Sequence, residues 1–116
     1  MDPTEIVVAI LDDALGVPVS TEVPATRPER LVTVDLEGEA GTPLIMRPRY
    51  QIVCWGRSDR EAHGIARACL DALWGAAETH PYLSACQMES MARDEWSATG
   101  QARYLLVVDL TINTDE

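Results

Sequence analysis

The chain contains no lysine: its nine basic side chains are all arginine, set against 19 acidic residues. The resulting net charge of −10 disfavours ordinary binding to nucleic acid, which needs Lys and Arg to displace counterions from phosphates. The charge is compatible with a protein that lets DNA slide past, because like charge keeps the polymer from adhering.

Long apolar runs are also missing. Hydrophobic residues make up 47% of the sequence, but runs such as 104–108 fall far short of the ~20 residues that cross a bilayer. The first five residues lack the basic region that precedes the apolar part of a secretory signal. We therefore expect a soluble chain that is neither exported nor bound to a membrane. At 116 residues we expect one domain, spanning 1–116.

Cysteine is sparse and irregularly spaced. Cys54, Cys69 and Cys86 make an odd count without any CxxC pair, which predicts neither a disulfide framework nor a zinc site. All three are interpreted as small core residues in a reducing interior.

The patterns that support catalysis are absent as well. His63 and His80 stand apart, and no Ser/His/Asp or Cys/His set follows from the spacing. Asp59 and His63 lie one helical turn apart, but a metal normally needs three or four ligands, so a solvated helix face is the better interpretation. Gly38 and Gly41 do not form a phosphate-binding loop. We predict no catalytic residue, no metal and no cofactor.

Two helices are predicted from capping signals and apolar periodicity. Asp2 can cap the first, Pro3 suits its first position and Gly16 follows its last periodic residue. The second opens at Ser58 with Glu61 three residues later, a capping box. Its apolar stripe is the widest in the sequence and predicts the main helix covering a sheet: Ala62, Ile65, Ala66, Cys69, Leu70, Leu73, Trp74 and Ala77.

Strands are predicted between and after these helices. The proline-flanked segment 17–24 is expected as a short edge strand. Alternation predicts strands over 31–37 and 44–55, joined by a loop over 37–43, with Pro48 marking a bulge or an edge segment. Two more are expected, over 83–91 and 101–113, separated by a polar turn that contains Trp96. The last strand is apolar on both faces, which suggests a central position or a covered outer face.

The order α-β-β-β-α-β-β predicts an α+β two-layer sandwich, with both helices on one face of a mainly antiparallel sheet. The opposite face then carries apolar side chains that would meet water, and such patches mark interfaces. Candidates for a subunit interface on this outer face are Gln51, Val53, Trp55, Leu105, Val107 and Asp109. Alternatively, a helix or the loop around Trp96 folds across this face within the subunit.

Four local features combine with this layout. The first helix ends in Gly-Val-Pro-Val, and Arg27-Pro28-Glu29-Arg30 leads into a strand. Residues 50–58, YQIVCWGRS, run directly into an Ala-rich helix, and residues 100–104, GQARY, open the final strand. Over nearly the whole chain this layout resembles the tail terminator (tail completion) proteins of phages with long, non-contractile tails. The absence of lysine and a short loop over 37–43 depart from that pattern.

The resemblance implies a structural protein of the virion without catalysis or cofactor. Such a protein forms a ring, commonly of six copies, that caps the tail tube at its head-proximal end and then presents the docking surface for the head. Its partners would be itself, the major tail tube protein and a head-completion or neck protein, assembled in the host cytoplasm. DNA would pass through the lumen unbound, so we expect acidic residues there, with candidates Glu37, Glu39, Asp94 and Glu95. The alternatives are another neck or head-completion protein and a small cellular α+β domain that binds a ligand or acts as an enzyme.

Overall fold

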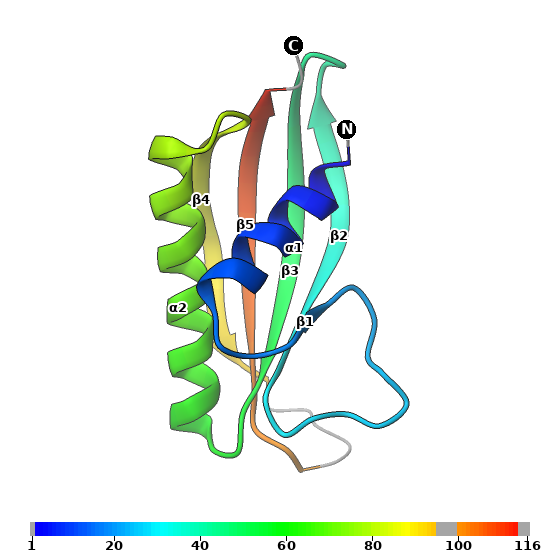
Figure 1. Ribbon diagram of the computed structural model, residues 1–116, viewed down its shortest axis with the longest axis vertical. Helices are drawn as coiled ribbons and strands as arrows, with labels where there is room; N and C mark the ends of the chain where they lie inside the picture. Colours follow the sequence, from blue (N-terminus) through cyan, green and yellow to red (C-terminus); the bar gives the residue numbers. More distant parts are fainter. Residues whose placement is uncertain (1, 95–99, 114–116) are drawn as a thin grey trace.

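The computed structural model describes residues 2–94 and 100–113 and consists of two layers (Figure 1). Helices α1 (Pro3–Ala14) and α2 (Asp59–Thr79) lie on the same face of a five-stranded sheet. The strands are β1 (Val19–Ser20), β2 (Leu31–Gly41), β3 (Ile45–Trp55), β4 (Leu83–Arg93) and β5 (Arg103–Asn113). This confirms the predicted α+β class, the order of elements and the placement of both helices.

Helix α1 begins and ends where the capping signals predicted. The carboxylate of Asp2 accepts a hydrogen bond from the Thr4 N–H at 2.9 Å, and Pro3 occupies the first turn, where no N–H is needed. Val7 and Leu11 are fully buried against the rest of the core. The Thr4 hydroxyl lies 3.0 Å from the hydroxyl of Tyr50 in β3, which links the helix to the sheet.

Helix α2 runs along the strands and covers β4, β5 and β3. Ser58 caps it by accepting from the Glu61 N–H, and Ala62, Ala66, Cys69 and Leu73 are buried as predicted. Trp74 is different. It was predicted to lie on the buried stripe, but 59% of its surface is exposed.

The strand order is β1-β2-β3-β5-β4, so β5 is interior, as its two apolar faces indicated. All neighbouring strands are antiparallel except β1, an edge strand that pairs in parallel with Val32 and Thr33 of β2. The expectation for Pro48 was wrong: β3 is interior and keeps its register there. Among the described residues, the pairs between β3 and β5 simply omit Arg47 and Pro48. Proline has no N–H to donate to a neighbouring strand.

The predicted loop over 37–43 is also wrong. Strand β2 continues to Gly41 and pairs with β3 as far as Met46, so the turn contains only residues 42–44. A one-residue shift between Leu36 and Gly38 places a bulge at Glu37. Gly41 has φ of 96°, a conformation that favours glycine, and the backbone then turns back into β3. Glycines and glutamates suggested a loop, but pairing with β3 outweighs their low strand propensity.

The main core lies between the sheet and the two helices. Tyr50, Ile52 and Cys54 point into it from β3, and Leu106, Val108 and Leu110 do so from β5. The Sγ atoms of Cys54 and Cys69 lie 3.9 Å apart, and all three cysteines are free and buried, as expected for core residues. Their neighbours in the core are apolar side chains, against which the three thiols pack.

Candidate functional site: the outer face and edges of the sheet

The outer face divides into a covered half and an open half. At the end where β3 leads into α2, Leu31, Val53 and Trp55 form a second apolar cluster, with Leu105 packed against it. Trp55 is only 4% exposed and Val53 only 9%. The expectation that both side chains meet water was therefore wrong. They belong to the interior of the subunit.

The cover over Trp55 is built partly from the segment that precedes β2. The guanidinium of Arg27 lies 5.7 Å from the centre of the Trp55 ring, and that of Arg103 lies 5.6 Å from it. Arg27 donates a hydrogen bond to the side-chain oxygen of Gln101, and Gln101 donates to the backbone carbonyl of Glu29 at 2.7 Å. These contacts join residues more than 70 positions apart in the chain, and they close this half of the outer face.

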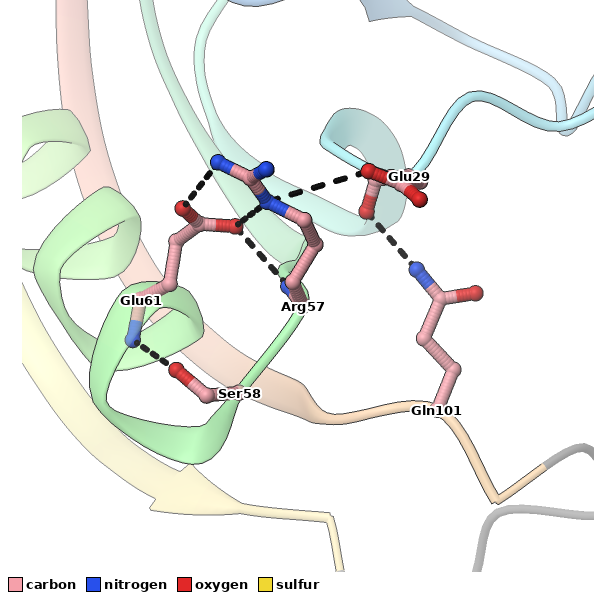
Figure 2. Close-up of polar contacts among 5 residues, drawn as sticks. All are labelled: Glu29, Arg57, Ser58, Glu61 and Gln101. Atoms are coloured by element: carbon pink, nitrogen blue, oxygen red, sulfur yellow. Dashed lines mark hydrogen bonds and ion pairs between the residues drawn. The ribbon is translucent and has the colours of Figure 1, made fainter.

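Arg57 connects the same segment to the start of α2 (Figure 2). Its backbone N–H donates to Glu61 at 2.8 Å, and its guanidinium lies 3.3 Å from Glu61 and 3.7 Å from Glu29. The hydrogen bonds from the backbone and side chain of Arg57 lower the pKa of Glu61. The side-chain hydrogen bond to Glu61 and the charges of Glu61 and Glu29 raise the pKa of Arg57. Gly56, next in the chain, must be small, because a Cβ there would lie 2.6 Å from the backbone nitrogen of Ala62.

The open half of the outer face holds the remaining interface candidates. Gln51, Leu105, Val107 and Asp109 are half-buried. Asp109 accepts two hydrogen bonds from Arg49, at 2.7 and 3.0 Å. This contact and the charge of Arg49 lower the pKa of Asp109. The role of these residues between subunits stays a prediction.

The acidic candidates do not form one group. Glu37 and Glu39 are exposed on β2 near the β2–β3 turn. Asp94 follows β4 at the opposite end of the sheet, where it forms an ion pair with Arg103 and is only 11% exposed in its side chain. Glu95 lies outside the described residues, as does Trp96. Glu37 and Glu39 are therefore the free acidic candidates of the described chain.

In the described part of the chain, both histidines make contacts with neighbouring side chains or backbone. His63 is exposed, and its ring contacts Tyr104 with 5.0 Å between ring centres. Nδ1 of His80 accepts from the backbone N–H groups of Tyr82 and Leu83, which shapes the turn into β4. Asp59 pairs with Arg93 at 3.2 Å. Within residues 2–94 and 100–113, no three His, Cys, Asp or Glu side chains are grouped as metal ligands.

Two exposed apolar surfaces were not predicted from the sequence. The first, the hairpin tip, consists of Leu44 and Ile45 at the β2–β3 turn, which are 61% and 43% exposed. The second, the Trp74 hollow, is an open depression of about 230 Å³ between the last turns of α2 and the start of β4. Its lining residues are Trp74, Ala77, Glu78, Ser84, Ala85 and Cys86. Trp74 could have been suspected, because it lies at the edge of the apolar stripe, about 100° around the helix from the buried Leu73.

No helix in the part of the chain that the structure describes is both long and apolar enough to span a membrane.

No protein-family model and no curated protein matches this sequence. Among solved structures, the fold is similar to a chain in the virion of a native gene transfer agent particle, with a TM-score of 0.65 and 18% sequence identity. The match covers 94% of this chain and 85% of that chain. A likeness of this extent and identity establishes a common fold over almost the full length of both chains.

Proposed function

We propose that this protein is a structural component of a phage-like virion. The observation that carries the proposal is the fold similarity to a chain of a gene transfer agent virion, because it spans nearly all of both chains instead of one motif. Folds host unrelated functions, so the surfaces must supply the rest of the argument. Here they offer exposed apolar side chains at the turns and edges of a sheet, which suit assembly with other proteins.

Within that class, the role that fits best is tail terminator. The chain forms a ring, of about six copies by the family resemblance, on the head-proximal end of the tail tube. There it stops polymerisation of the tube protein and presents a surface to the head-completion or neck protein. The protein acts by binding its neighbours, with neither a cofactor nor a reaction.

The lumen of such a ring must let the genome pass. With no lysine and a net charge of −10, the ring repels DNA at most of its surface. Glu37 and Glu39 are exposed and can contribute to an acidic lumen. Glu95 stays a candidate, and Asp94 contributes less because Arg103 neutralises it. Tight binding of the assembled ring to duplex DNA at physiological salt would contradict this assignment.

Deletion of the gene from a particle-producing genome tests the role directly. Without a terminator, electron microscopy should show overlong tubes that are not joined to heads, beside heads filled with DNA. Tubes of normal length that fail to join heads would instead indicate a head-completion or neck protein. Particles of normal shape and length would exclude both roles.

A further inference from the structure

We propose that the hairpin tip of one subunit docks into the Trp74 hollow of the next copy, so that these two surfaces form the head-to-tail contact of the ring. The inference rests on the proposed function, since it assigns the contact by which the ring closes. It differs from the outer-face interface considered above, whose apolar centre is covered within the subunit.

The hairpin tip and the Trp74 hollow differ from the rest of the surface in how much apolar side chain they expose. Leu44 and Trp74 are the two most exposed large hydrophobic side chains of the described chain, at 61% and 59%. They lie in different parts of the subunit: Leu44 is in the β2–β3 turn, and Trp74 is on α2 beside β4. An apolar projection and an apolar depression on one molecule are complementary if two copies meet.

Their positions suit a ring. The Trp74 hollow adjoins β4, which is one edge of the sheet, and the hairpin tip extends from β2, next to the other edge. Among the described strands, β1 alone lies beyond β2, and it pairs with Val32 and Thr33 but with no later residue of β2. Both surfaces also lie at the same end of the sheet, since Ile45 is opposite Asn113 and Leu83 is opposite Ile112 (Figure 1). A heterologous contact requires two different patches on opposite sides of the subunit, and it closes a ring when the rotation fits.

Charge favours a second copy as the occupant. Arg47 is exposed two residues beyond Ile45, and Glu78 is exposed at the rim of the hollow. Neither has an ion-pair partner among the described residues, whereas the exposed Arg49, Arg57 and Arg93 do. Two copies with a charge of −10 each repel one another, so a contact is favoured where the arginine of one copy meets the glutamate of the other.

The size of the hollow argues against a small molecule. About 230 Å³ is below the range of roughly 300–1,000 Å³ for ligand pockets, and the hollow is open to solvent. It suits one aliphatic side chain with its neighbour, which is what the hairpin tip presents.

Charge reversal in two separate proteins tests the contact. Arg47→Glu alone places Glu against Glu at every contact, and Glu78→Arg alone places Arg against Arg. Each should raise the concentration needed for assembly at least about tenfold, by light scattering under conditions where the wild type forms its ring. An equal mixture of the two variants should assemble again, because in an alternating ring with an even number of subunits every contact is Glu against Arg. Arg60→Glu, exposed in the first turn of α2 and so at the opposite end of the helix from the hollow, is the control of equal charge change and should assemble like wild type.

The outcomes separate this inference from the proposed function. If the wild type forms a ring and both single variants do so at the same concentration, the contact between subunits lies elsewhere. The inference is then overturned, but the proposed function is not. If each variant fails, stays folded by circular dichroism and is not rescued by mixing, the two surfaces do not meet each other, and the inference is overturned. If the wild type forms no ring at any concentration, even with tail tubes present, the proposed function fails and the inference with it.

Discussion

Replacing Trp55 with alanine tests whether the outer-face cluster belongs to the interior of the subunit. Trp55 is 4% exposed, rests on Leu31 and Val53 and is flanked by the guanidiniums of Arg27 and Arg103. Truncation of a buried tryptophan costs about 3–5 kcal/mol. The two cation–π contacts account for about 0.5–1 kcal/mol each of such a loss.

A domain of this size is stable by about 5–15 kcal/mol, so Trp55→Ala removes a large part of the free energy of unfolding. The melting temperature should fall by roughly 10–20 °C. Urea unfolding followed by circular dichroism gives the free energy. Trypsin cleavage after Arg30, in the segment that leads into β2, gives a local measure and should become faster in the variant.

Arg27→Met is the matched comparison, and its expected effect is much smaller. The change removes one cation–π contact and the hydrogen bond to Gln101, but the buried Nε of Arg27 has no partner within the described structure. Such an orphan donor costs about 1–3 kcal/mol, which offsets most of what the guanidinium contributes. We expect a net change within about 1 kcal/mol. A loss from Arg27→Met as large as that from Trp55→Ala would refute this reasoning, as would a Trp55→Ala protein of wild-type stability.

Three further predictions concern charge and thiols. Asp13→Lys should stabilise the protein by about 0.3–1 kcal/mol in thermal unfolding, because α1 has no basic residue in its last turn, where the helix dipole favours one. Asp109→Asn should cost at most about 1 kcal/mol at pH 7, since the pair with Arg49 is partly exposed. The pKa of Asp109 is lowered in the folded state, so this difference should be fully present above about pH 4 and vanish as the pH falls through the folded pKa; a difference that grows on acidification would contradict the assignment. The three cysteines are buried, and burial raises the pKa of Cys86 to about 11, so an aromatic disulfide reagent at pH 8 should label them only after unfolding.

The fold could be predicted because its signals are local. The side chains that cap α1 and α2 lie within three residues of the N–H groups they satisfy, and the apolar alternation of β3 and β5 appears in short windows of sequence. The length of the β2–β3 hairpin could not be predicted, because the glycines and glutamates of 37–41 become a strand only by pairing with β3. Local composition favoured a loop there, but pairing with the next strand along the chain determined the structure.

The residues that cover Trp55 could not be predicted from the sequence for a different reason. Arg27 and Gln101 are 74 residues apart, and nothing in either neighbourhood indicates that they meet. Their contact turns an apparently exposed apolar face into a small interior cluster. The alternation along β3 correctly placed Val53 and Trp55 on the face opposite the helices. It did not indicate which segment of the chain covers that face.

The two positions where sequence patterns failed most clearly, the hairpin and Trp74, also hold the two most exposed large apolar side chains of the described residues. In a chain whose local preferences otherwise agree with its fold, such conflicts are expected at functional surfaces. A polar residue at either position would suit a protein that stays alone better than Trp74 or Leu44, which are 59% and 61% exposed. Both side chains are explained if their solvent exposure is temporary, and head-to-tail contact between copies ends it at both sites at once.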